Sequence, residues 1–232
     1  MKKNTPELIL ALDVDDVKKA CGLVSDLYPR ISYFKVGLQL FTACGPEIIT
    51  FITGKGARVF LDLKLHDIPN TVASAVRQGV TAGVSMMTLH VTGGEDMMKA
   101  AAHAAAEEAK RLKIVRPQLV GVTVLTSSAA DPEDVLAKAR AAVACGLDGV
   151  VCSAGETALL RKHLPASAQI VTPGIRLTGT AAHDQKRVAT IEDAVRAGSS
   201  CLVVGRPILQ SSSPREAADV MVETLQSAYR AL

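Results

Sequence analysis

Short apolar runs of strand length recur along the chain, and a stretch with the apolar spacing of a helix follows each of them. Residues of the intervening stretches are mainly Ala, Glu and Lys, which favour helix. The pattern predicts helices that include 95–112, 132–145 and 214–229. It predicts strands at 8–14, 33–37, 58–65, 85–91, 118–125, 149–154, 169–175 and 201–206.

The order of these elements predicts the fold class. Strict alternation of strand and helix is typical of an α/β protein with a parallel sheet. Eight such units within 232 residues favour a closed (β/α)8 TIM barrel over an open, doubly wound sheet. Because no linker, repeat or low-complexity segment interrupts the pattern, we expect residues 1–232 to form a single domain.

Composition narrows the classes of protein to which the chain can belong. With 48% hydrophobic residues it can bury one large core. A formal charge of +3, 3% aromatic residues and no tryptophan argue against a nucleic-acid partner. No apolar run approaches a membrane span and the N-terminus lacks a signal-peptide core, so we expect a cytoplasmic protein without a membrane partner. The five cysteines form no Cys-x-x-Cys pair, and we expect them to be small hydrophobes.

Residues 60–71 hold the densest group of chemically active side chains, in the order Phe-Leu-Asp-Leu-Lys-Leu-His-Asp-Ile-Pro-Asn-Thr. Because strand side chains alternate between two faces, Asp62 and Lys64 share one face while the leucines at 61, 63 and 65 share the other. Charges in an apolar strand are costly unless they are paired, and functional sites tolerate such a cost. A structural ion pair at the strand end is the alternative explanation.

The barrel prediction places further charges beside this pair. Catalytic groups of a (β/α)8 barrel lie at the carboxyl ends of its strands. Asp13 falls near the end of the first predicted strand and Lys35 near the end of the second, while Asp62 and Lys64 close the third. Since these strands are neighbours in a barrel, we expect four charges of alternating sign to meet at one rim. A single charge there would more often be a solvated rim residue.

The last two strands end in a different chemistry. Strand seven runs into Thr-Pro-Gly-Ile-Arg at 172–176 and strand eight into Val-Gly-Arg-Pro-Ile at 204–208. The loops after strands seven and eight often bind phosphate in such barrels, and Gly205 with Arg206 fits that use. A long polar segment at 177–187 is typical of a lid. The five histidines lack zinc-like spacing, so we expect no metal site. The charges at the first three strand ends and the arginine after the eighth strand predict an enzyme that acts on a phosphorylated small molecule.

Several motifs, in order along nearly the whole chain, resemble the orotidine 5′-phosphate decarboxylase family. Its signature is similar to Asp-x-Lys-x-x-Asp-Ile-Pro-Asn-Thr at 62–71. Other blocks that resemble the family are Leu-Ala-Leu-Asp (10–13), Phe-Lys-Val-Gly (34–37), Val-Thr-Val-Leu-Thr-Ser (122–127), Thr-Pro-Gly-Ile-Arg (172–176), Asp-Gln-Lys-Arg-Val (184–188) and Val-Gly-Arg-Pro-Ile (204–208). The resemblance implies cofactor-independent decarboxylation of orotidine 5′-monophosphate to uridine 5′-monophosphate, the last step of de novo UMP synthesis.

The resemblance also implies a role for each matching residue. Lys64 would protonate the ring carbon, Asp62 would lie against the departing carboxylate, and Lys35 and Asp67 would complete the catalytic network. Asp67 and Thr71 would reach into the site of a neighbouring subunit, which implies a homodimer with shared sites. The substrate-binding set implied is Asp13, Lys35, Ile68, Thr71, Thr126, Pro173, Arg176, Gln185, Gly205 and Arg206.

Two alternatives stay open at this stage. One is a magnesium-dependent keto-sugar-phosphate decarboxylase or hexulose-phosphate synthase of the same barrel superfamily. Those enzymes share the Asp-x-Lys strand but not the Asp-Ile-Pro-Asn-Thr continuation together with the Asp-Gln-Lys-Arg segment found here. The other is a non-catalytic nucleotide-binding barrel, which would have lost a charge from the network, and none is lost.

Overall fold

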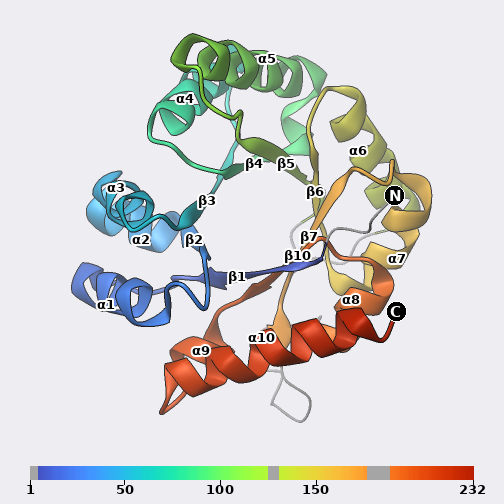
Figure 1. Ribbon diagram of the computed structural model, residues 1–232. Coiled ribbons are helices and arrows are strands. Elements are labelled where there is room, and N and C mark those ends of the chain that lie inside the picture. The colour runs from blue at the N-terminus through green and yellow to red at the C-terminus, as the bar shows by residue number, and fades with distance from the viewer. Residues whose placement is uncertain (1–4, 125–130, 177–188) are drawn as a thin grey trace.

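The architecture is a closed barrel of parallel strands (Figure 1). The structure, a computed structural model, describes residues 5–124, 131–176 and 189–232. Within them the barrel closes in the order β1-β10-β7-β6-β5-β4-β3-β2, with every neighbouring pair parallel. Its strands are β1 (Glu7–Ala11), β2 (Tyr33–Gly37), β3 (Arg58–Leu65), β4 (Met86–His90), β5 (Gln118–Val122), β6 (Gly149–Val151), β7 (Gln169–Pro173) and β10 (Cys201–Val204). The predicted (β/α)8 fold is confirmed.

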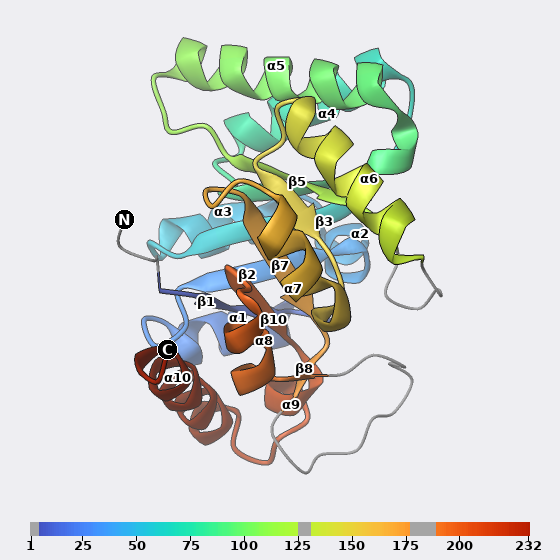
Figure 2. The same ribbon diagram turned by 90° about the vertical axis from the view of Figure 1, so that its right-hand side faces the viewer.

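Helices surround the barrel on its outside (Figure 1). Helices α4 and α5 pack side by side, as do α8 and α10, and Figure 2 shows both pairs from a second direction. The helices are α1 (Val17–Leu27), α2 (Leu38–Cys44), α3 (Glu47–Gly54), α4 (Pro69–Thr81), α5 (Glu95–Leu112), α6 (Pro132–Ala144), α7 (Ala154–His163), α8 (Ile191–Ala197), α9 (Arg206–Leu209) and α10 (Pro214–Arg230), with a 3-10 turn η1 (Val91–Gly93). No helix of the described residues is long and apolar enough to span a membrane.

Local sequence explains where several helices begin. Proline opens α4, α6 and α10, where its missing N–H has no helical acceptor to lose. Asp16 and Asp131 each accept a hydrogen bond from a backbone N–H of the first turn. Ser153 and Glu156 form a capping box at the start of α7. These caps fix how each helix leaves the rim that carries the site.

Two apolar layers hold the fold together. The barrel interior is filled by one cluster, and its members come from alternate strand positions: Ile9, Ala11, Tyr33, Phe60, Met86, Val120, Val171, Cys201 and Val203. The larger cluster lies between the strands and the helices and includes Leu10, Phe34, Leu61 and Val150. Leu63 and Leu65 pack against this outer layer, so the predicted leucine face of β3 is confirmed. The period-two alternation therefore divides each strand between a filled lumen and a helix-covered exterior.

Several strands are shorter than predicted. Strand β1 ends at Ala11, before Asp13, and β6 ends at Val151, before Cys152. The predicted seventh strand is divided: β7 ends at Pro173, Gly174 has φ +80°, and a separate two-stranded sheet pairs β8 (Ile175–Arg176) with β9 (Ala189–Thr190). The apolar pattern of the sequence extends past these strand ends, but the hydrogen-bonded pairing between strands does not. The additional residues form the rim that carries the functional groups.

Candidate active site

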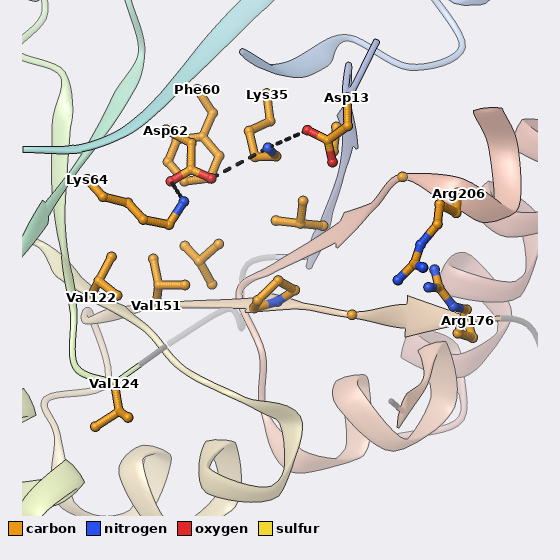
Figure 3. A pocket seen from close by; sticks show the side chains of 16 residues that line it. Asp13, Lys35, Phe60, Asp62, Lys64, Val122, Val124, Val151, Arg176 and Arg206 are labelled. Carbon is orange, nitrogen blue, oxygen red and sulfur yellow. Dashed lines mark hydrogen bonds and ion pairs between the residues drawn. The ribbon is translucent and has the colours of Figure 1, made fainter. Parts of the chain in front are cut away.

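A cavity of about 200 Å³ opens at the carboxyl ends of the barrel strands (Figure 3). One part of it is lined by Asp13, which follows β1, by Lys35 of β2, and by Asp62 and Lys64 of β3. Arg176 and Arg206 line another part, on the opposite side from Lys64. The cavity lies where the fold predicts a catalytic centre.

Four charged side chains form a continuous series across one wall of the cavity (Figure 3). Lys35 Nζ donates to Asp13 Oδ1 at 2.9 Å and lies 3.5 Å from Asp62 Oδ2. Lys64 Nζ donates to Asp62 Oδ1 at 3.0 Å. The order is therefore Asp13, Lys35, Asp62, Lys64, with the charge sign alternating along the series. The expectation that the first three strands bring these four groups together is confirmed.

Asp62 lies at the centre of this series and is nearly buried, with its side chain 13% exposed. Burial by itself raises the pKa of the Asp62 carboxyl, whereas the ammonium groups of Lys35 and Lys64 lower it. Hydrogen bonds from Lys64 and Thr88 lower it further, and the resulting pKa lies below the ordinary value. Asp62 is thus an anion held in place by two cations and a hydroxyl.

Strand β3 departs from regular geometry at Lys64. The Lys64 backbone has φ +52°, in the left-handed region that non-glycine residues seldom adopt. The register of β3 against β4 shifts at the same point, since Leu61 pairs with Met87 whereas Leu65 pairs with Leu89. Simple alternation therefore does not by itself explain how Asp62 and Lys64 come to share the cavity. The buried Thr88 contacts both residues through its hydroxyl.

The opposite side of the cavity is cationic. Figure 3 shows Arg176 and Arg206 with their guanidinium groups turned toward one another. Arg176 follows the positive-φ Gly174 after β7, and Arg206 begins α9 directly after Gly205. A Cβ on Gly205 would lie 3.5 Å from both the Ala11 Cβ and Asp13 Oδ2, so the chain passes close to β1 here. Two planar guanidinium groups suit the oxygens of a phosphate.

Apolar side chains complete the wall between the two charged regions. They come from several barrel strands and from the residue Val124 beyond β5, and comprise Ala11, Phe60, Val122, Val124, Val151, Val171, Pro173 and Val203. Such a wall excludes water, and in a water-poor site each charge interaction is stronger than in solvent. The predicted substrate-binding residues Pro173 and Gly205 both lie in the lining.

Other predicted site residues do not line this cavity. Asp67, Ile68 and Thr71 are exposed, with Ile68 at 67%, and Asp67 Oδ1 accepts a hydrogen bond from the Ile68 N–H at 2.7 Å. None of the three is among the residues that line the cavity with Lys64. Thr126, Gln185 and the predicted lid at 177–187 lie outside the described residues.

Two residues at the site had no role in the prediction from sequence. Thr88 touches Asp62 and Lys64, and its signal was a single hydroxyl in the apolar run Met-Met-Thr-Leu. Gly37 adjoins Lys35, since a Cβ there would lie 2.9 Å from Lys35 Nζ. In the sequence it is only a glycine at the end of a predicted strand, and glycines are common there in turns without any function.

The arrangement defines a class of protein: a (β/α)8-barrel enzyme that faces its substrate with interleaved lysine and aspartate on one side and arginine on the other. No group of three or more His, Cys, Asp or Glu in the described ranges is placed to hold a metal ion. Residues 6–221 match the model of the Orotidine 5'-phosphate decarboxylase / HUMPS family, and the chain belongs to that family.

Individual relatives resemble the chain over nearly its full length. An orotidine 5'-phosphate decarboxylase from Coxiella burnetii is 42% identical, with 98% of this chain and 100% of the relative covered. One from Vibrio cholerae is 43% identical, covering 97% and 98%. The crystal structure of the Lactobacillus acidophilus orotidine 5'-phosphate decarboxylase superposes with a TM-score of 0.83 at 34% identity, covering 97% of this chain and 99% of that one. The family expected from the sequence motifs is confirmed.

Proposed function

We propose that this protein decarboxylates orotidine 5′-monophosphate to uridine 5′-monophosphate in pyrimidine biosynthesis. The family match and the relatives of that name support the reaction. The single structural observation that carries it is the series Asp13, Lys35, Asp62 and Lys64 along a cavity whose opposite side holds Arg176 and Arg206. Such a cavity fits a ligand with a reactive anionic ring at one end and a phosphate at the other.

The chemistry requires fixed positive charge at the reacting carbon. Loss of carbon dioxide from the pyrimidine ring leaves an electron pair that no adjacent carbonyl or imine delocalises. The Lys64 ammonium, 3.0 Å from Asp62 and beside an apolar wall, supplies that stabilisation without reorganisation of solvent. The same ammonium then transfers its proton to the carbon. Lysine suits this step because arginine does not give up a proton.

Asp62 and Lys35 prepare the site for that step. The Asp62 carboxylate accepts a hydrogen bond from Lys64 and its lowered pKa favours the anion, and we assign it to orient Lys64 and to crowd the substrate carboxylate. Lys35 lies between two carboxylates, and we assign Lys35 and Asp13 to the ribose hydroxyls. The arginines anchor the phosphate, whose binding energy positions the ring against the charged series.

A chelator-controlled assay with matched variants tests the proposal. Purified protein is incubated with orotidine 5′-monophosphate and excess chelator while formation of uridine 5′-monophosphate is followed. We expect full turnover, and we expect Lys64→Ala to lower it by at least about a thousandfold, as for loss of a main transition-state charge contact. Lys99→Ala, which removes an exposed lysine paired with Glu95, is the matched control and should keep wild-type activity.

Three outcomes would contradict the proposal. A magnesium requirement with sugar-phosphate substrates would select the other enzymes of the superfamily. Binding of the nucleotide without turnover would indicate a non-catalytic barrel. Substantial activity in folded Lys64→Ala would remove the assignment of Lys64 as the acid.

We also propose that the enzyme works as a homodimer in which each site is completed across the interface. Asp67, Ile68 and Thr71 are exposed and follow directly after β3, the strand that carries Asp62 and Lys64. An interface at this place would cover Ile68, an apolar residue that is 67% exposed. The family resemblance assigns Asp67 and Thr71 to the neighbouring subunit's site.

Mixing two inactive variants tests shared sites. Lys64→Ala and Asp67→Ala are each expected to be inactive alone. Random reassortment gives half mixed dimers with one intact site each, so we expect about a quarter of wild-type activity in the mixture. Absence of recovery in a mixture whose tagged subunits have exchanged would contradict the shared site.

A further inference from the structure

Thr88 is a buried polar residue in the middle of β4. Its neighbours Met87 and Leu89 are apolar and buried, and Thr88 itself is 1% exposed. It does not line the cavity and therefore does not touch a ligand there. Its hydroxyl nevertheless bonds to both residues that we assign to the reacting end of the substrate.

The direction of both hydrogen bonds follows from the atoms involved. The Lys64 N–H can only donate, so Thr88 Oγ1 accepts from it at 2.8 Å. The one hydroxyl proton of Thr88 is then available to Asp62 Oδ1, at 3.0 Å. Lys64 Nζ donates to the same carboxylate oxygen. Thr88 thus joins the main chain of Lys64 to the side chain that holds its ammonium.

The local backbone shows why this hydroxyl is needed. Between the pairs Leu61–Met87 and Leu65–Leu89, three residues of β3 face Thr88 alone on β4. The excess length is accommodated with Lys64 at φ +52°, a backbone conformation that is unfavourable for a non-glycine residue and persists only when its surroundings hold it. At this irregular point of the ladder the Lys64 N–H donates to the Thr88 side chain.

We propose that Thr88 is a positioning residue, which holds the Lys64 backbone in its left-handed conformation and fixes the Asp62 carboxylate so that the Lys64 ammonium meets the reacting carbon. This inference rests on the proposed function of Lys64 and deepens it. Thr88 acts through these two residues and not on the substrate. Its removal should therefore affect the chemical step more than the binding step.

Thr88→Val tests the proposal because it keeps the shape of the side chain and removes only the hydroxyl. We expect kcat to fall between about tenfold and about a hundredfold, since the Lys64 N–H loses its acceptor and Asp62 Oδ1 loses one of its two donors. KM should change by no more than about twofold, because the arginines and the apolar wall are untouched. Thr88→Ser keeps the hydroxyl and should restore kcat to within about threefold of wild type.

Thr123→Val is the matched control. Thr123 is also a buried threonine, 2% exposed and directly after β5, but its hydroxyl donates to the Val151 carbonyl at 3.3 Å and not to the charged series. We expect its kcat and KM to remain at wild-type values. Thermal unfolding of each variant reports whether the fold is intact, and Thr88→Ala replaces Thr88→Val if the latter does not fold.

Each outcome either supports or overturns the positioning role. A drop in kcat at constant KM, rescued by serine and absent in Thr123→Val, supports it. Wild-type kcat in folded Thr88→Val or Thr88→Ala overturns it, as does an equal loss in Thr123→Val. Lys64→Ala is measured alongside: if that variant keeps its activity, the proposed function of Lys64 fails, whereas an inactive Lys64→Ala with a fully active Thr88→Val refutes Thr88 alone.

Discussion

At Gly37, one added methyl group should lower activity while leaving stability nearly unchanged. It ends β2, pairs with Asp62 across the sheet, and lies beside Lys35. Its φ of −96° and ψ of −178° describe extended backbone that alanine adopts without strain. A Cβ there would nevertheless lie 2.9 Å from Lys35 Nζ and 3.5 Å from Asp13 Oδ1. The glycine is therefore required by the space that the Lys35 ammonium occupies.

The distances set the size of the expected effect. An ordinary contact for a Cβ begins at 3.4 Å, so the Lys35 ammonium must move by about half an ångström. At an effective dielectric constant of about 20, a comparable lengthening of its 2.9 Å contact with Asp13 weakens the attraction by about 1 kcal/mol. Displacement of a catalytic group by about 1 Å can lower the rate about a hundredfold. We therefore expect Gly37→Ala to lower kcat/KM by about tenfold.

The assay compares decarboxylation and urea unfolding of Gly37→Ala with those of Gly22→Ala. Gly22 lies in α1, where an added Cβ meets nothing within 4 Å, so alanine should raise stability by about 0.5–1 kcal/mol and leave activity unchanged. Gly37→Ala should change stability by no more than about 1 kcal/mol, because the end of one side chain can move. Wild-type kcat/KM in stable Gly37→Ala would refute the reasoning, and severe destabilisation would show that more than the ammonium is displaced.

Two further predictions concern charge. The pKa of Asp62 lies below its ordinary value of about 4, so the stability that its ionised form contributes is present above pH 4 and is lost as the pH falls through the folded-state pKa. The difference in unfolding free energy between wild type and Asp62→Asn should therefore shrink below about pH 4 in urea titrations, and a pH-independent difference would contradict this. Arg206→Ala should weaken binding of uridine 5′-monophosphate by about 2–5 kcal/mol in calorimetry and leave binding of uridine unchanged. Arg196→Ala, which removes an exposed ion pair with Asp193, is the control and should change neither affinity. Equal losses for nucleotide and nucleoside in Arg206→Ala would contradict the phosphate assignment.

The sequence determined the architecture and most of the site. Apolar runs with period two, separated by helical stretches, predicted each barrel strand, because a closed parallel sheet needs one lumen face and one helix-covered face. Charges at the ends of the first three strands predicted the series from Asp13 to Lys64, because parallel strands in register end at the same rim. Arg206 followed from the same rule at the opposite side, and the resemblance to the family added Arg176.

Tertiary structure decided the features that depend on contacts between strands. The left-handed backbone at Lys64, the register shift of β3 and the hydrogen bonds of Thr88 arise where two strands of unequal local length meet, and no single strand's sequence encodes that mismatch. The space that makes glycine necessary at position 37 exists only because Lys35 turns across it toward Asp13. The sequence alone therefore identified the charged side chains that form the site. The backbone geometry that orients them depends on pairing between strands that are distant in the sequence, and a pattern along the chain does not contain that information.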